Sequence, residues 1–202
     1  PSISSAASDV YKRQPLLYAM VSTWSSCVEL PIQRLFIALS AQKGLCMYGG
    51  DAREAYAHAP APEMMTHLTI DDAYYEWYRE KTGKSLNRRF VLPVLHSLQG
   101  HPESGKMWMK LIDRILIKDL GFATTTKDRC IYIKKIDGRI ILLLRQVDDF
   151  CCSCTDEQDA KNIYNLIGTK IQFQSEREKG DIPFEYLGLV KDYNGTDLIQ
   201  TK

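Results

Sequence analysis

The most prominent hydrophobic stretch of this chain covers residues 140–152, IILLLRQVDDFCC. No proline or glycine interrupts it, and an apolar run of this length predicts a buried strand. Two adjacent carboxylates, Asp148 and Asp149, nevertheless lie inside it. A buried charge is costly unless it is paired or bound to a metal, and neighbouring carboxylates also repel each other. We therefore expect a cation beside them, unless they form the solvated tip of a hairpin, where aspartates are common.

A third carboxylate, Asp51, follows a second apolar segment, residues 45–50. Carboxylate oxygens suit Mg²⁺ or Mn²⁺, which keep several waters and recruit further ligands from substrate phosphates. The pattern therefore predicts a divalent-cation site wherever the fold brings Asp51 to the pair at residues 148 and 149.

Helical periodicity and helix-stop signals define the helices of the chain. The predicted helices cover residues 31–44, 71–82, 98–120 and 155–167, and the glycines that end them are Gly44, Gly83, Gly121 and Gly168. The second of these segments is polar and rich in aromatic residues, so it reads as a helix or as an insertion. The apolar stripe of the third is typical of a helix that packs against a core.

Short apolar runs and turn dipeptides define the strands. The predicted strands cover residues 46–48, 90–94, 130–133, 140–147, 171–173, 184–190 and 198–199, with hairpin turns at Asp137-Gly138 and Asn194-Gly195. Helices and strands in this order predict an α+β fold, in which helices cover one face of a mainly antiparallel sheet.

The composition is that of an ordinary globular protein. The chain has 202 residues, 45% hydrophobic and 25% charged, enough for one large domain or one and a half. No apolar run reaches the roughly 18 residues of a membrane span, and no cleavable signal is evident. The formal net charge is +1, so any surface that binds nucleic acid must be local rather than global.

The six cysteines do not form the two C-x-x-C pairs of a zinc site. The residues Cys151, Cys152 and Cys154 would project from both faces of one strand, which favours small core side chains over a metal cage. Reduced thiols are the expectation.

Residues 1–14, PSISSAASDVYKRQ, are small, polar and aperiodic. They are typical of a non-native leader or of an ordinary disordered N-terminus, and we exclude them from the fold. The folded part is then expected over residues 15–202.

Four motifs occur in the order and spacing of reverse-transcriptase motifs. They are Asp51-Ala-Arg-Glu-Ala-Tyr56, Leu98-Gln99-Gly100, Gln146-Val-Asp-Asp149 and Phe184-Glu-Tyr-Leu-Gly188. Over residues 30–202 the chain resembles the polymerases of copia-type (Pseudoviridae) LTR retrotransposons. The resemblance implies a ferredoxin-like polymerase palm with partial fingers and a C-terminal primer-grip hairpin.

The resemblance also implies a reaction, namely RNA-directed DNA synthesis by two-metal nucleotidyl transfer. The residues Asp51, Asp148 and Asp149 would hold two Mg²⁺ ions, with Mn²⁺ as a substitute. Asp149 is the weakest of the three candidates, because adjacent strand residues point to opposite faces. The implied partners are an RNA or DNA template with its primer and deoxynucleoside triphosphates, with no membrane. The implied location is a cytoplasmic retroelement particle with a nuclear stage.

Other matched residues receive roles by the same resemblance. Tyr56 is the candidate steric gate against a ribose 2′-hydroxyl, with aromatic packing under the sheet as the alternative. Gln99 and Gly100 match the contact with the incoming nucleotide, and Leu187 and Gly188 match the primer grip.

Basic side chains give weaker signals. Arg145, beside the carboxylates in sequence, is expected to form a structural ion pair rather than to bind phosphate. The basic cluster of Lys84, Arg88 and Arg89 either contacts the phosphates of a template strand or is a solvated surface.

The chain also departs from the family pattern. Gln146 stands where copia-type enzymes carry tyrosine. The basic fingers segment is expected before residue 30, and the thumb, connection and RNase H regions after residue 202, so we expect a palm fragment with weak or no activity alone. The alternatives are a degenerate, non-catalytic relic or nucleic-acid-binding palm and, less favoured, a two-metal nuclease or cyclase.

Overall fold

The computed structural model describes residues 23–175, 185–186, 189–191 and 198–200. The chain divides into two compact units. The first, here the arm unit, comprises Pro1–Trp24 and Tyr56–Trp108; the second, the sheet unit, comprises Ser25–Ala55 and Met109–Lys202.

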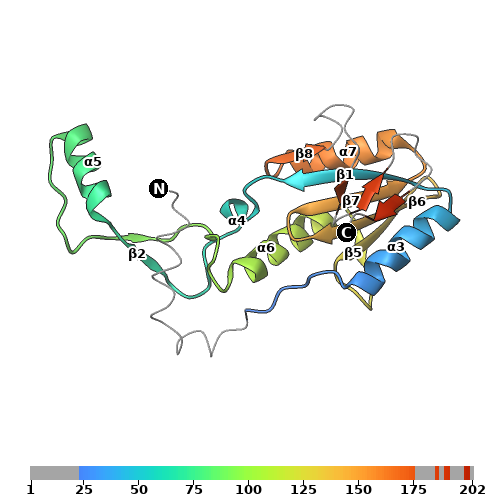
Figure 1. Cartoon of the computed structure of the whole chain (residues 1–202), viewed down its shortest axis with the longest axis horizontal. Helices are drawn as coiled ribbons and strands as arrows, with labels where there is room; N and C mark the ends of the chain where they lie inside the picture. The colour runs from blue at the N-terminus through green and yellow to red at the C-terminus, as the bar shows by residue number, and fades with distance from the viewer. Residues whose placement is uncertain (1–22, 176–184, 187–188, 192–197, 201–202) are drawn as a thin grey trace. The chain divides into compact units, whose positions relative to one another are not determined.

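The sheet unit is built on a six-stranded antiparallel sheet (Figure 1). In spatial order its strands are β4 (Ala123–Thr124), β5 (Ile131–Ile136), β6 (Arg139–Gln146), β7 (Asp149–Cys154), β1 (Cys46–Ala52) and β8 (Phe173–Ser175). Every neighbouring pair is antiparallel. The predicted α+β class is therefore confirmed.

The stretch over residues 140–152 is two strands rather than one. β6 ends at Gln146, β7 begins at Asp149, and Gln146 is paired with Asp149 across the two-residue turn between them. The expectation of a single buried strand was wrong at residues 147 and 148, and the hairpin alternative is correct. Because the turn contains neither glycine nor proline, local sequence gave little sign of it.

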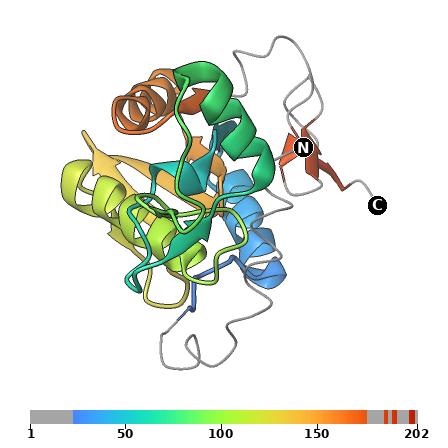
Figure 2. The same cartoon turned by 90° about the vertical axis from the view of Figure 1, so that its left-hand side faces the viewer.

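Helices lie on both faces of the sheet. The buried side chain of Phe36, from α3 (Leu30–Gln42), packs with Leu142, Leu144 and Cys151 on one face. Figure 2 shows α3 on one side of the sheet and α6 and α7 on the other. α6 and α7 thus share one face as expected, and α3 departs from that expectation by covering part of the opposite one.

The predicted helix over residues 98–120 is shorter and in two parts. α6 (Ser104–Asp113) continues directly into a π-helix, η1 (Arg114–Asp119). Its apolar stripe is buried as predicted, with Ile112, Ile115 and Leu116 almost fully covered. The helix begins only at Ser104, because Gly100 adopts a φ of +86° in the turn before it.

α7 (Glu157–Gly168) is held to the sheet through one phenol. The hydroxyl of Tyr164 donates to the carbonyl of Tyr48 at 2.6 Å and accepts from the N–H of Cys152 at 3.0 Å. The helix begins as the sequence predicts, with the carboxylate of Asp156 accepting from the N–H of Gln158. One aromatic side chain thus links the helix to β1 and β7.

A glycine in β1 allows an aromatic ring to lie directly on the sheet. A Cβ atom on Gly50 would lie 2.6 Å from the ring of Phe173 and 3.1 Å from that of Tyr164. The Phe173 ring also packs edge-on against Phe150, with 5.2 Å between ring centroids. The absence of a side chain at position 50 therefore leaves room for this aromatic cluster.

The arm unit contains a small hairpin and a helix. β2 (His67–Thr69) pairs with β3 (Val91–Pro93), and α5 (Asp72–Thr82) lies between them in sequence. α4 (Ala55–His58) begins at the boundary of the two units. The predicted helix over residues 71–82 is confirmed.

The C-terminal strands form a separate three-stranded antiparallel sheet. They are β9 (Glu185–Tyr186), β10 (Leu189–Lys191) and β11 (Leu198–Gln200). The expected pairing of the last two strands is confirmed, while the turn at Asn194-Gly195 lies outside the described residues. Among the helices of the described residues, none has the length and apolar character to cross a membrane.

All six cysteines lie within the described residues, and none of them forms a disulfide. Cys151 belongs to the cluster around Phe36, whereas the alternation along β7 directs Cys152 and Cys154 to the other face. The three thiols are buried on both faces of one strand, as predicted.

Candidate functional site

Two carboxylates face each other across the junction of β1 and β7. The antiparallel register pairs Asp51 directly with Asp149, and both side chains are partly exposed. Directly opposed residues in such a pair have Cβ atoms about 4.5–5.5 Å apart on one face of the sheet. Acids that are almost a hundred positions apart in the chain are therefore neighbours.

The third candidate, Asp148, lies in the turn that precedes β7. Its side chain is exposed, and its carbonyl accepts a hydrogen bond of 2.9 Å from the N–H of Ala52. The residue after the first carboxylate thus holds the turn that carries the other two. All three predicted acids belong to one corner of the sheet unit.

The register distinguishes the two adjacent aspartates. Asp149 is the residue opposite Asp51, while Asp148 occupies the second position of a two-residue turn. Asp149 was ranked as the weakest metal ligand because adjacent residues of a strand point to opposite faces. That rule does not apply here, because Asp148 lies in the turn and the strand begins only at Asp149. Asp149 is therefore the better placed partner for Asp51.

The turn itself is strained at Val147, which has a φ of +55°. A positive φ at the first residue of a two-residue hairpin turn normally calls for glycine or asparagine. A β-branched residue in this conformation is a genuine outlier, and such strain costs about 1–3 kcal/mol. Strain of this kind is concentrated at functional sites, where the surrounding structure maintains it.

The chemistry of the donors fits a hard divalent cation. Opposed carboxylates repel each other, and oxygen-only donors favour Mg²⁺ or Mn²⁺ over softer metals. Within the part of the chain that the structure describes, no three His, Cys, Asp or Glu side chains converge as a complete metal cage. Mg²⁺ needs no such cage, because it retains waters and takes phosphate oxygens as ligands.

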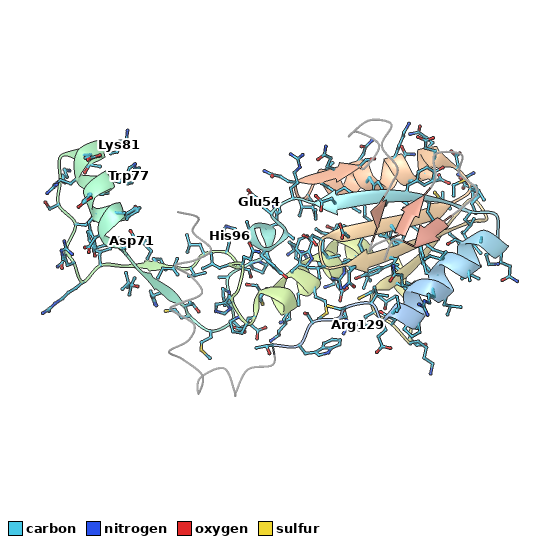
Figure 3. All side chains as sticks on the ribbon, viewed as in Figure 1. Glu54, Asp71, Trp77, Lys81, His96 and Arg129 are labelled. Atoms are coloured by element: carbon cyan, nitrogen blue, oxygen red, sulfur yellow. The ribbon has the colours of Figure 1, made fainter. Side chains whose placement is uncertain are left out.

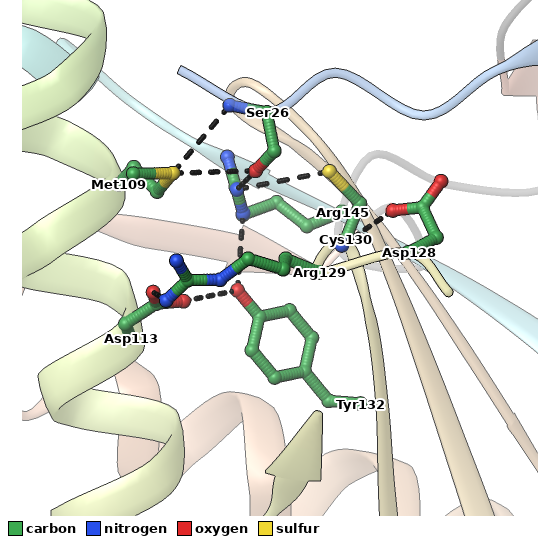
Figure 4. Close-up of polar contacts among 8 residues, drawn as sticks. All are labelled: Ser26, Met109, Asp113, Asp128, Arg129, Cys130, Tyr132 and Arg145. Atoms are coloured by element: carbon green, nitrogen blue, oxygen red, sulfur yellow. Dashed lines mark hydrogen bonds and ion pairs between the residues drawn. The ribbon is translucent and has the colours of Figure 1, made fainter. Parts of the chain in front are cut away.

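Arg145 lies on the other face of the sheet from the carboxylates. It is paired with Phe150, one residue after Asp149, so its side chain projects to the opposite side. Only 1% of its surface is exposed. Its Nε donates to the hydroxyl of Tyr132 at 3.4 Å, and an Nη donates to the Oγ of Ser26 at 3.1 Å (Figure 4). Arg145 therefore has a structural role.

The charge of this buried arginine is balanced through a phenol. The hydroxyl of Tyr132 donates to the carboxylate of Asp113 at 2.7 Å, and Asp113 also pairs with Arg129 at 3.1 Å. Burial raises the pKa of Tyr132 far above its ordinary value, so its proton stays available for this bond. The expected structural role of Arg145 is supported, but its partners are hydroxyls and a thiol, with no direct ion pair among the described contacts of this cluster.

The last two residues of β6 hold an N-terminal segment in place. Arg145 binds the side chain of Ser26, and the Oε1 of Gln146 accepts from the N–H of Val28 at 2.9 Å. Gln146 is the position at which the chain departs from the copia-type pattern. Its side-chain amide thus connects residues 26–28 to the strand that leads into the turn.

The predicted nucleotide-binding residues belong to the arm unit. The backbone pairs Pro60 with His96, and the Oγ of Ser97 donates to the carbonyl of Pro60 at 2.8 Å. This bridge joins the segment after Tyr56 to the segment before Gln99 and Gly100. Tyr56 is partly exposed and Gln99 exposed. Contacts of these three residues with a nucleotide stay a prediction. The primer-grip candidates Leu187 and Gly188 lie outside the described residues.

No sequence pattern indicated a buried polar group that lies a few residues after Gly100. Glu103 is completely buried, and its Oε2 accepts from the N–H of Met64 at 3.3 Å, while its Oε1 has no hydrogen-bond partner among the described residues. The Nδ1 of the buried His101 accepts from the N–H of Glu103 at 3.1 Å. Burial lowers the pKa of His101, and the charge of Glu103 partly opposes this effect. A histidine and a glutamate around a proline gave no pattern that would predict burial.

Comparisons with known proteins give a coarse similarity. No protein-family model matches the chain, and no curated protein matches it. Among solved structures, it is similar to apo telomerase from Candida tropicalis truncated from its C-terminal domain, with 13% identity, a TM-score of 0.45, and coverage of 98% of this chain and 45% of that one. It is also similar to telomerase from Candida tropicalis in complex with a TWJ fragment of telomeric RNA, with 12% identity, a TM-score of 0.34, and coverage of 98% and 37%.

The chain spans less than half the length of these two structures. This similarity is weak, since both TM-scores lie below 0.5. At this level of identity it assigns neither a reaction nor a substrate.

Proposed function

We propose that this chain is the palm region of an RNA-directed DNA polymerase of the copia-type retrotransposon class. The single observation that carries the proposal is the register that pairs Asp51 with Asp149. Repulsion between two opposed carboxylates is relieved when a cation binds between them. A polymerase palm uses such a site, and a purely structural sheet has no need of one.

In this proposal Asp51, Asp149 and Asp148 are the carboxylates that hold two Mg²⁺ ions. When bound, the ions would activate a primer 3′-hydroxyl, neutralise the triphosphate and stabilise the departing pyrophosphate. The chain supplies the position of the acids. The strained turn at Val147 and the hydrogen bond from Ala52 to Asp148 keep the three carboxylates at one corner before any ligand arrives. The partners are a template with its primer and deoxynucleoside triphosphates, in a retroelement particle.

Binding of Mn²⁺, followed by the loss of the electron paramagnetic resonance signal of the free ion, tests the metal site directly. We expect binding by the wild-type chain, competition by Mg²⁺, and a loss of about tenfold or more in affinity for Asp51→Asn and Asp149→Asn. Asp137→Asn is the matched control, because Asp137 is an exposed hairpin residue with a φ of +49° that asparagine also tolerates. Equal Mn²⁺ affinity of Asp51→Asn and wild type would contradict the proposal.

Primer extension on an oligo(dT)-primed poly(rA) template tests the reaction itself. We expect weak, Mg²⁺-dependent extension that Asp149→Asn abolishes and Asp137→Asn preserves. Extension that does not depend on Asp149 would disprove the assigned chemistry, whatever the outcome of the metal measurement.

A second candidate is a non-catalytic palm that binds nucleic acid. The observation that favours it is that Lys84, Arg88 and Arg89, the basic cluster noted in the sequence, are all exposed. The two candidates predict different results, because a non-catalytic palm binds template–primer equally well with Asp51→Asn and without added Mg²⁺.

A further inference from the structure

One face of α5 carries a stripe of aromatic and cationic side chains. Tyr74, Trp77, Tyr78 and Lys81 have the spacing i, i+3, i+4 and i+7, so they share one side of the helix. The rings of Tyr74 and Trp77 are 5.3 Å apart between centroids, and their exposed fractions are 37% and 49%. α5 has no buried residue at all. Figure 3 shows Trp77 and Lys81 on this helix.

The opposite side of α5 is already occupied by the segment that follows it. The guanidinium of Arg88 lies over the ring of Tyr75 at 5.3 Å and forms an ion pair with Asp72. The hydroxyl of Tyr75 donates to the carbonyl of Asn87 at 3.4 Å. These contacts satisfy one acid and one cation of the segment. Among the described residues of the arm unit, the Tyr74–Trp77 face stays exposed.

Several cations of the segment remain without an acidic partner. Among the described residues Lys81, Lys84 and Arg89 form no ion pair, and all three are exposed. The carboxylate of Asp71 is engaged at the start of the helix, where it accepts from the N–H of Tyr74 at 2.8 Å. Residues 71–89 contain five lysine and arginine residues against four acids, and of these acids Asp72 and Glu76 point to other sides of the helix than the stripe.

We propose that the α5 stripe, Tyr74, Trp77, Tyr78 and Lys81 with the neighbouring Lys84 and Arg89, binds single-stranded nucleic acid. Exposed rings alone would suit any apolar partner, and exposed cations alone would suit any polyanion. A partner that is both a polyanion and a series of flat, apolar surfaces is a single strand, whose unpaired bases stack on aromatic side chains while its phosphates pair with lysine and arginine. Duplexes bury their base faces and would leave the rings of α5 without a partner.

This surface is distinct from the carboxylate pair, and its proposal does not rest on catalysis. Anisotropy of short fluorescein-labelled oligodeoxythymidylate and oligouridylate measures the binding, and a labelled duplex of the same length is the comparison. We expect both single strands to bind more tightly than the duplex. Because stacking of one base is worth about 1–3 kcal/mol, Trp77→Ala should weaken binding about tenfold or more.

Trp24→Ala is the matched control, since Trp24 is 59% exposed and lies outside the stripe. It should bind as wild type does. For the phosphate contacts, Lys81→Gln should lower the slope of log affinity against log salt by about 0.7, the value for one phosphate contact on a single strand. Lys43→Gln, which removes the same charge at the end of α3, should leave the slope unchanged.

Equal affinities of the Trp77→Ala and Trp24→Ala variants would overturn the proposal, as would equally tight binding of the duplex. A change in sedimentation with Trp77→Ala but no change in oligonucleotide affinity would show a protein interface and also overturn it. Circular dichroism confirms folding of each variant, which is expected because no α5 residue is buried. Asp149→Asn should retain full oligonucleotide binding. A wrong proposal for the α5 stripe can therefore be distinguished from a wrong proposal for the metal site.

Discussion

The N–H of Ala52 donates to the carbonyl of Asp148 at 2.9 Å, so the strand that carries Asp51 is bonded to the turn that carries the other two acids. The bond adds to the pairing of Asp51 with Asp149. Two adjacent positions of β1 thus contact two adjacent positions of the hairpin. The corner is specified by backbone hydrogen bonds.

Replacement of Val147 by glycine should stabilise the protein. Glycine adopts a positive φ without the roughly 1–2 kcal/mol cost of a left-handed conformation, and its greater freedom in the unfolded chain offsets only part of this gain. We expect an increase of about 0.5–1 kcal/mol in the free energy of unfolding, measured with urea. Metal affinity should fall, because the acids are then less fixed.

The control for this substitution is Val91→Gly, in the exposed strand β3, where φ is negative. That change should destabilise the protein slightly, since glycine weakens strands. A loss of stability in Val147→Gly as large as that in Val91→Gly would show that the turn stores no strain.

Replacement of the buried Arg145 by alanine should cost about 3 kcal/mol or more of unfolding free energy. The change leaves the buried hydroxyls of Tyr132 and Ser26 without the guanidinium that donates to them, while Asp113 keeps its pair with Arg129. Arg145→Lys should recover only part of the loss, because an ammonium group cannot donate in the fork geometry of a guanidinium. Urea unfolding followed by circular dichroism measures both effects.

The matched control is Arg34→Ala, because Arg34 is exposed on α3 and has no ion pair among the described residues. It should change stability by less than about 0.5 kcal/mol. If Arg145→Ala is equally mild, the buried network does not hold residues 26–28 to β6.

Acidification should destabilise the protein through His101. Burial lowers the pKa of His101 in the folded chain below its ordinary value of 6.5. The unfolded chain therefore binds more protons than the folded chain in this range, and stability rises with pH there. The contribution is fully present above pH 6.5 and is lost as the pH falls through the lower, folded pKa.

Urea unfolding between pH 7.5 and pH 5.5, a range of roughly two units around the ordinary histidine pKa, measures this effect. His101→Gln should show a smaller loss of stability on acidification, because glutamine can still bind Thr66 but does not titrate. The exposed Gln42, which does not titrate, supplies the control, and Gln42→Asn should retain the wild-type pH dependence. Identical pH profiles for His101→Gln and wild type would contradict the assignment.

A methyl group at Gly50 should destabilise the protein by about 1–3 kcal/mol. It would lie 2.6 Å from the ring of Phe173, and that ring is confined by Phe150 and Tyr164. The smaller side chain of Phe173→Leu should relieve part of this cost in the double variant, as a double-mutant cycle would detect. Gly168→Ala, where nothing lies within 4 Å of the added atom, should be neutral or stabilising. A neutral Gly50→Ala would show that the ring moves freely.

Local features of the sequence were enough to predict most of the elements. Pro31, Gly83 and Asp156 each act within one helical turn, and the helices they start or end are found where expected. The Asp137-Gly138 hairpin is equally local, since both residues adopt a positive φ of the kind that this dipeptide favours. The alternation along β7 also predicted correctly that its cysteines would be buried on both faces.

Other features were decided only by the tertiary structure. The two aspartates after Val147 were the only turn signal there, and the positive φ of Val147 accompanies the pairing of β6 with β7 and the bond from Ala52. The burial of Glu103 and the position of α3 across the sheet from α7 likewise have no local signature.

The three acids could be named from the sequence, but the pairing of Asp51 with Asp149 required β1 to enter the sheet between β7 and β8. Helix caps and hairpin dipeptides act over a few residues, because they depend on backbone angles and on bonds to near neighbours. Strand order and register depend instead on the burial of side chains that are far apart in the chain, and that energy exists only when the whole core is assembled.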